Sequence, residues 1–189
     1  MLSTLNHWMA CMPNVNNHGC WQTRTGEGHV DDRGLASALI EFIGGHTVID
    51  FGCGLGANVE AIGPNARGYD GNPHTPLIAG DRCEVLDLAV PVLVEPADWV
   101  LSLEVGEHIP AEFQDAFIGN LHTHNRLGIV ISWAVPGQGG CGHVNCRDNG
   151  YVRGIFHELG YTSDYGAQTQ LRAAASMVWF KNTLMVFRR

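Results

Sequence analysis

The chain has 189 residues, 45% of them hydrophobic, and a formal net charge of -8. This length and apolar content predict one domain over residues 1–189, in which residues 1–30 form an N-terminal arm or lid. Lys181 is the only lysine and the arginines are scattered, which argues against a duplex nucleic-acid binder and its clustered basic face. No apolar run of about 18 residues occurs, so no membrane-spanning helix is expected. We also expect no signal peptide and a cytoplasmic location, because the first residues lack a basic segment followed by an apolar one.

Apolar residues at helical spacing alternate with short apolar runs of strand length. In chain order, the predicted elements are a helix over 31–45, a strand over 46–52, a helix over 57–63, strands over 66–71, 82–88 and 97–105, a helix over 110–125, a strand over 126–135, a helix over 151–160, a strand over 161–165, a helix over 169–180 and a strand over 182–189. This alternation predicts an α/β, Rossmann-like fold with a seven-stranded, mostly parallel sheet. Helices should cover both faces, and the last two strands should form an antiparallel hairpin.

Three glycines follow the first strand at alternate positions, in the stretch VIDFGCGLG (48–56). Ligands bind such sheets beyond the carboxyl ends of the strands, where glycines permit a tight turn and a close approach to the backbone. The spacing differs from the G-x-G-x-x-G dinucleotide fingerprint and from a phosphate-binding P-loop. Asp70 ends the next strand, and an acid there can accept hydrogen bonds from both hydroxyls of a ribose. These features predict a site for a nucleoside cofactor.

Four segments in order resemble the motifs of class I S-adenosylmethionine-dependent methyltransferases. They are VIDFGCGLG, GYDGNP, EVLDLAVP and DWVLSLEVGEHIP, and the resemblance extends from about residue 30 to the C-terminus. It implies S-adenosyl-L-methionine as the cofactor and a set of residues that bind it. These residues are Asp50, Gly52, Cys53 and Gly54 for the methionine moiety, Asp70, Gly71 and Asn72 for the ribose, Asp87 and Leu88 for the adenine, and Leu103 and Glu104 for the amino end.

Methyl transfer requires alignment of the acceptor with the methyl group, and it requires a base only where the acceptor must lose a proton. His143, in the glycine-rich loop after the fifth strand, is the first candidate for a base or substrate ligand. His108, in EVGEHIP, is the second, although a Glu-His pair at this place in related enzymes often serves packing. Further substrate contacts are expected from Trp133 and Asn145 near that loop and from Trp21, Arg24 and His29 in the arm.

Two groups of cysteine and histidine raise the question of a metal. They are Cys11, His18 and Cys20 in the arm, and Cys141, His143 and Cys146 in the loop. Neither has the close cysteine pairs of a structural zinc site. Free thiols and no bound metal are therefore expected.

The leading functional hypothesis is an enzyme that methylates a small molecule on oxygen, nitrogen or sulfur, because the chain carries no added substrate-binding domain. The Asn/Asp-Pro-Pro-Tyr signature of many amino-methylating enzymes is missing after the fourth strand, where SLEV stands. Alternatives are a protein methyltransferase and a non-catalytic module that binds the cofactor or a partner. A nicotinamide dehydrogenase is disfavoured by the glycine spacing. The oligomeric state stays open.

Overall fold

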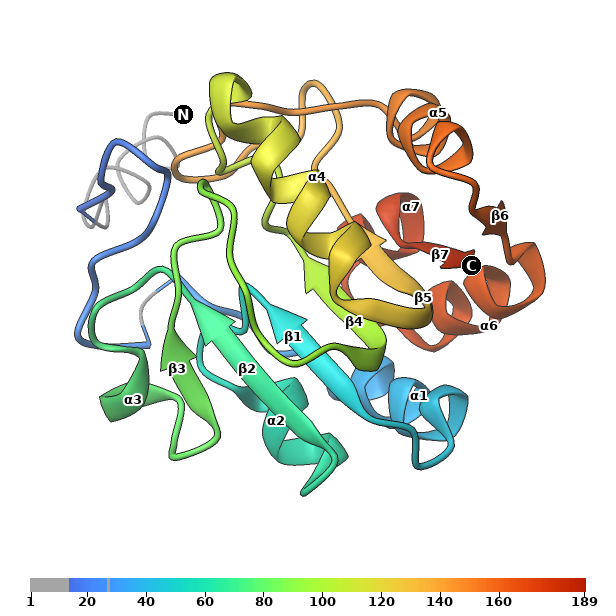
Figure 1. Ribbon diagram of the computed structural model, residues 1–189, viewed down its shortest axis with the longest axis horizontal. Helices are drawn as coiled ribbons and strands as arrows, with labels where there is room; N and C mark the ends of the chain where they lie inside the picture. Colours follow the sequence, from blue (N-terminus) through green and yellow to red (C-terminus); the bar gives the residue numbers. More distant parts are fainter. Residues whose placement is uncertain (1–13, 27) are drawn as a thin grey trace, which may run out of the picture.

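A single seven-stranded sheet forms the centre of the molecule, which is known from a computed structural model that describes residues 14–26 and 28–189 (Figure 1). The strand order is β3-β2-β1-β4-β5-β7-β6. β7 runs antiparallel to both of its neighbours, and the remaining pairs are parallel. The strands are β1 (Val48–Phe51), β2 (Ala66–Asp70), β3 (Cys83–Val85), β4 (Ala97–Leu103), β5 (Asn125–Ser132), β6 (Thr162–Ser163) and β7 (Met185–Arg188). The expected fold class is confirmed.

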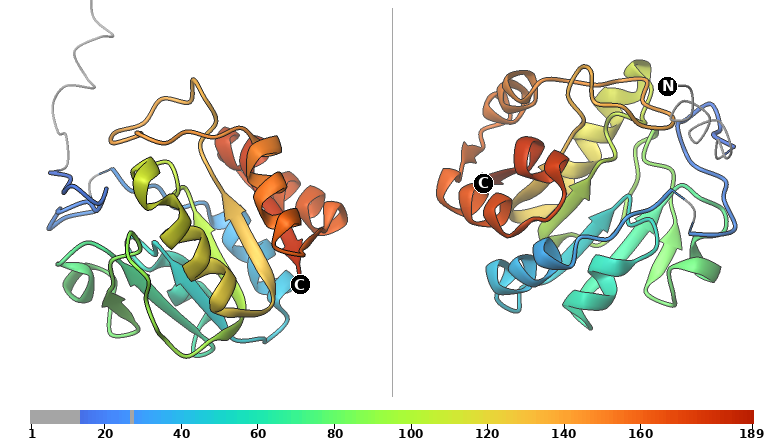
Figure 2. Two further views of the ribbon diagram at one scale, coloured as in Figure 1. Left: turned by 45° about the horizontal axis from the view of Figure 1, so that its top comes forward. Right: turned by 180° about the vertical axis from the view of Figure 1, so that it is seen from behind.

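Helices cover both faces of the sheet (Figure 2). They are α1 (Arg33–Ile43), α2 (Ala57–Ile62), α3 (Thr75–Ile78), the short 3-10 helix η1 (Ala111–Phe113), α4 (Gln114–Thr123), α5 (Asn149–Glu158), α6 (Tyr165–Ala174) and α7 (Val178–Thr183). Residues of α4 and α5 share one hydrophobic core with one face of the strands, and residues of α1, α2, α6 and α7 share the second core with the other face. Within the described part of the chain, no helix has the length and hydropathy needed to cross a bilayer.

β1 is central because all four of its residues are buried, and side chains from both of its faces enter a core. Such burial on both faces is typical of parallel strands that helices cover twice. In register, Asp50 lies opposite Gly68 of β2 and Leu101 of β4, so these strands end at one edge of the sheet. The arm (dark blue) and the loop after β5 (orange) gather at that edge (Figures 1 and 2).

The C-terminal helical region departs from the predicted single helix over 169–180. It forms two helices, α6 and α7, separated by an extended residue, Ala175 (φ -61°, ψ 141°). Asp32 stabilises this break, since its carboxylate accepts hydrogen bonds from the backbone N–H groups of Ser176 (2.7 Å) and Met177 (2.8 Å). The same carboxylate caps α1 through the N–H of Leu35. α3 was also not predicted.

Replacing Asp32 by alanine should destabilise the fold by roughly 2–4 kcal/mol, because it removes a helix cap and two further hydrogen bonds to a charged group. Burial opposes ionisation of this carboxyl, but the N–H groups of Met177, Leu35 and Ser176 outweigh burial and lower its pKa. A lowered folded-state pKa gives stability that is present above the ordinary pKa of about 4 and is lost as the pH falls further. Urea unfolding of D32A at pH 7 and at pH 3 should therefore show the larger loss at pH 7. Asp31→Ala, at the exposed neighbouring acid, is the control, and an equal loss in both variants would contradict the prediction.

Candidate functional site

The turn after β1 needs backbone conformations that side chains rarely allow. Gly52, Gly54 and Gly56 all have positive φ, at 83°, 54° and 73°. A Cβ on Gly54 would also collide with the imidazole ring of His29, at 2.6 Å from Cδ2. Glycine at this position therefore allows the arm to pack directly on the turn.

The acids at the ends of β1 and β2 lie around this turn. Asp50 is almost completely buried, and its carboxylate accepts one hydrogen bond, from the Asn58 side chain at 3.4 Å. Burial, with a smaller contribution from the charge of Asp70, raises the pKa of Asp50 to about 7. Asp70 accepts hydrogen bonds from the backbone N–H groups of Gly54 and Asn72, each at 2.9 Å, and burial still raises its pKa. The buried Asp50 and the half-buried Asp70 therefore lie close enough for the charge of one to influence the other.

Asp87, after β3, is the acid expected to meet adenine. One of its oxygens accepts the N–H of Ala89, and the other lies 2.5 Å from Nδ1 of His18 in the arm. The His18 ring also packs edge-on against Phe113, with 4.7 Å between ring centroids. Leu88 is buried in the core beside them. The sequence analysis considered His18 only as a metal ligand, and a contact across 69 residues has no local sequence signal.

The described part of the arm lies along the ends of β1, β2 and β4. Asn72 donates to the Thr23 carbonyl (2.8 Å), and the Arg24 guanidinium donates to His74 (3.3 Å). Trp21 packs edge-on against both His29 (5.1 Å between ring centroids) and His108 (5.6 Å). The arm thus joins the glycine turn to the segment after β4. Residues 1–13 and 27 of the expected arm, Cys11 among them, lie outside the described residues.

A close approach also joins the arm to the end of β2. A Cβ on Gly71 would collide with the side chain of Cys20. The absence of a side chain at Gly71 therefore leaves space for the arm. Gly71 directly precedes Asn72, whose backbone N–H donates to Asp70.

β4 ends at Leu103, and the next residue, Glu104, has an unusual backbone conformation. Glu104 has φ 55°, and among the described residues it is the only one other than glycine with a positive φ. Such a conformation costs about 1–3 kcal/mol and must be held by its surroundings. The Glu104 N–H donates to the Ser132 side chain (2.9 Å), while its carboxylate accepts hydrogen bonds from Gln138 (2.5 Å) and Thr183 (3.4 Å). The Glu104 side chain is thus bonded to the loop after β5 and to α7.

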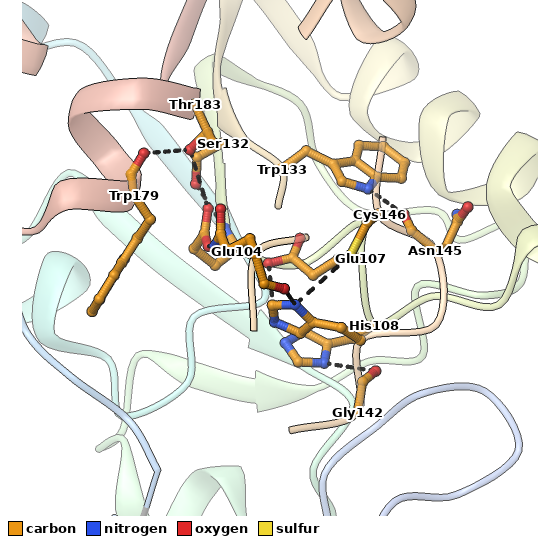
Figure 3. Close-up of polar contacts among 12 residues, drawn as sticks. Glu104, Glu107, His108, Ser132, Trp133, Gly142, Asn145, Cys146, Trp179 and Thr183 are labelled. Atoms are coloured by element: carbon orange, nitrogen blue, oxygen red, sulfur yellow. Dashed lines mark hydrogen bonds and ion pairs between the residues drawn. The ribbon is translucent and has the colours of Figure 1, made fainter. Parts of the chain in front are cut away.

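Glu107 and two histidines form a compact group, which we call the Glu107 cluster: Glu107, His108 and His143. Figure 3 shows Glu107 and His108 side by side within it. One ligand atom from each residue lies within 4.8 Å of the others. His108 Nδ1 lies 3.2 Å from the Gly142 carbonyl, and His143 Nδ1 lies 3.2 Å from the Gln138 carbonyl. Burial and the neighbouring His143 lower the pKa of His108 to about 4. The structure therefore brings together the two histidines that the sequence nominated, with a buried acid that it did not.

The loop after β5 is fixed at its far end. Trp133 is fully buried in the core, and its indole N–H donates to the Asn145 carbonyl at 2.7 Å. The Asn145 amide donates to Gln114 (3.3 Å), so this side chain is also occupied inside the protein. Both residues therefore brace the loop that carries His143. Glu107 and Gln138 were not candidates from the sequence, because their partners, His143 and Glu104, lie 36 and 34 residues away.

No protein-family model matches the chain, and no curated protein matches its sequence. Solved structures with a similar fold include magnesium protoporphyrin IX methyltransferase from Synechocystis PCC 6803 with bound S-adenosylmethionine, at a TM-score of 0.58 and 18% identity over 88% of each chain. The N-methyltransferase NodS from Bradyrhizobium japonicum WM9, in complex with S-adenosyl-L-homocysteine, has a TM-score of 0.58 and 16% identity over 82% of this chain and 85% of that one. The chain therefore has the fold of class I methyltransferases.

Asp50→Asn should stabilise the ligand-free protein by roughly 2–4 kcal/mol more at pH 8 than at pH 4, which is close to the pKa of this carboxyl in the unfolded chain. A folded-state pKa of about 7 lies above the unfolded value, so the native state holds a proton that it loses as the pH rises to 7. Above that pH the wild type carries an unfavourable buried charge, which the amide avoids. Urea unfolding at both pH values measures the difference, with the exposed Asp81→Asn as control. Equal destabilisation of D50N at both pH values would show that Asp50 is ionised throughout.

Proposed function

We propose that the chain is an S-adenosyl-L-methionine-dependent methyltransferase that acts on a small molecule at oxygen, nitrogen or sulfur. The observation that carries this proposal is the pair of acids around the glycine turn, the buried Asp50 and the half-buried Asp70. Two carboxylates in a poorly solvated place favour a ligand that brings positive charge. S-adenosylmethionine carries a sulfonium and an ammonium group, and its ribose hydroxyls can donate to the remaining lone pairs of Asp70.

The same acids argue against a nicotinamide dinucleotide. Its pyrophosphate would bring negative charge to the glycine turn, where Asp50 and Asp70 already repel each other. The glycine spacing also differs from the dinucleotide fingerprint. The fold shared with the two methyltransferases supports the same choice of cofactor.

In the proposed reaction, a lone pair of the acceptor forms a bond to the methyl carbon while the carbon–sulfur bond breaks. S-adenosylhomocysteine is the product that leaves. Where the acceptor carries a proton, we assign its removal to His143, because a pKa of about 4 makes His108 a weak base at neutral pH.

Trp21, beside His108, is the arm residue best placed to cover the acceptor. We expect Arg24 and His29 to lie nearer the ribose side, close to His74 and Gly54.

A cytoplasmic location is part of the proposal. Cys20, Cys53, Cys83 and Cys146 are thiols that form no disulfide, and Cys53 and Cys83 are buried beside the glycine turn. Reducing compartments keep thiols in this state. The net charge of -8 makes nucleic acid a poor acceptor.

Calorimetric titration of the purified protein with S-adenosylmethionine, S-adenosylhomocysteine and NAD tests the cofactor. We expect the first two to bind, NAD not to bind, and Asp70→Asn to weaken binding by at least about tenfold through lost ribose hydrogen bonds. Because a cationic ligand lowers the pKa of Asp50 from about 7, S-adenosylmethionine binding near pH 7 should release a proton. Titrations in buffers of different ionisation enthalpy detect that proton.

The exposed Asp81→Asn is the matched control and should bind as the wild type does. Failure of both sulfur ligands to bind a well-folded protein would refute the assignment. Binding without turnover of any acceptor in a broad small-molecule screen would instead favour the non-catalytic module.

The contact between His18 and Asp87 leads to a prediction about the arm. The adenine amino group and His18 compete for the same Asp87 oxygen, so His18→Ala should tighten S-adenosylhomocysteine binding a few-fold. Asp87→Asn should weaken it, because the amide replaces an acceptor with a donor. Titration calorimetry of both variants gives the answer. Weaker binding by H18A would mean that His18 supports the adenine site and does not block it.

A further inference from the structure

Glu107 is buried without the partners that a buried carboxylate requires. Its side chain has 0% exposure, and neither carboxylate oxygen has a hydrogen bond of ordinary geometry within the described structure. The backbone N–H groups of Glu107 and Ala134 lie near enough to favour the ionised form, but burial outweighs them. Its nearest ion-pair contact is Nε2 of His143, at 3.9 Å. A buried charge without partners costs several kcal/mol or more. Such a residue calls for a ligand that the protein atoms themselves do not provide.

A second carboxylate adds to this cost. Burial first, and then the charge of Glu104, raise the pKa of Glu107 well above its usual range. Glu104 is itself held in place by Gln138 and Thr183, so it cannot turn away without losing both bonds. Two acids held together in a buried place are a common arrangement around a bound cation.

The two histidines have the geometry of metal ligands. Each Nδ1 lies beside a backbone carbonyl, Gly142 for His108 and Gln138 for His143, so we assign the ring proton to Nδ1. Nε2 of each neutral ring then carries the lone pair. Metal-binding histidines generally donate their other ring N–H to a carbonyl or carboxylate in this way, which fixes the orientation of the ring.

Backbone hydrogen bonds hold Glu107 and His143 together, although 36 residues of chain separate them. The N–H groups of Val144 and Asn145 both donate to the Glu107 carbonyl, each at 2.9 Å. His143 therefore cannot shift without breaking bonds to the residue it faces. Gly140 packs directly against the His143 ring, where a Cβ would collide with it. The Glu107 cluster is thus ordered before any ligand arrives.

We propose that Glu107, His108 and His143 bind one divalent transition-metal ion through the carboxylate and the two Nε2 atoms. Two imidazoles and one carboxylate suit Mn²⁺, Fe²⁺, Co²⁺ or Zn²⁺ better than Ca²⁺ or Mg²⁺, which prefer oxygen ligands throughout. Three protein ligands leave coordination positions for water or for an oxygen of the acceptor. The ion balances the charges of Glu107 and Glu104, and its binding does not depend on the proposed methyl transfer. Because the ion takes the Nε2 lone pair of His143, this histidine can remove a proton from the acceptor only in the metal-free protein.

The test is a titration of EDTA-stripped, cofactor-free protein with Co²⁺, followed by the visible absorption of the bound ion. We expect saturation at one equivalent and displacement by Zn²⁺. Loss of a residue that only hydrogen-bonds a metal ligand typically weakens metal binding ~10–100-fold. Glu107→Gln and His143→Ala each remove a ligand itself, so each should weaken Co²⁺ binding by more than that. Glu112→Gln, an exposed acid on η1, and His157→Ala, an exposed histidine, are matched controls that should bind as the wild type does.

Thermal unfolding separates a lost ligand from a lost fold. In EDTA, E107Q should melt within a few degrees of the wild type, because the amide replaces a carboxyl group of nearly the same size and shape. With Co²⁺ present, the wild type should melt above E107Q. The proposal is overturned if well-folded wild type shows no saturable Co²⁺ signal, or if E107Q binds as tightly as the wild type. It is equally overturned if Cys146→Ser abolishes binding while E107Q retains it. S-adenosylmethionine titrated in EDTA reports on the cofactor separately.

Discussion

The backbone N–H groups of Gly54 and Asn72 hold the Asp70 carboxylate between them, and this pair of bonds ties the turn after β1 to the end of β2. The turn can present its N–H to Asp70 only because its glycines adopt positive φ. Asn72 in turn binds the arm through the Thr23 carbonyl. One carboxylate therefore sets the relative position of two strands, a loop and the segment that lies over them.

Negative charge is gathered at one edge of the sheet and has different partners along it. At β1 and β2 the acids meet backbone N–H groups and an amide, and they have lone pairs to spare for a ligand. After β4, Glu107 lies near two histidines that backbone carbonyls orient, while Glu104 is bonded to Gln138 and Thr183. The first half suits the proposed cofactor and the second suits a metal ion. Trp21 packs against His29 on one side and His108 on the other, so the arm is in contact with both halves.

Local patterns in the sequence predicted the fold and most of its elements, because apolar periodicity and glycine turns depend on neighbours in the chain. The glycine turn and Asp70 were recognisable for the same reason. The break between α6 and α7 was not, since the bonds that stabilise it come from Asp32, 144 residues away from Ser176. The sequence nominated both histidines of the Glu107 cluster, but Glu107 itself and the grouping of the three were missed for a similar reason. Glu107 and His108 are adjacent, but the loop that brings His143 to them is positioned by hydrogen bonds that no spacing reveals.

The place of β7 in the sheet has a consequence for the order in which the molecule can assemble. β7 lies between β5 and β6 and is synthesised after every other strand. Until it emerges, β5 is an edge strand that offers unpaired backbone groups along an apolar run, and β6 has no partner at all. Exposed edges of this kind pair readily with other chains. The nascent chain therefore depends on β7 to close the sheet, and the edge of β5 stays open to other chains until that strand has been made.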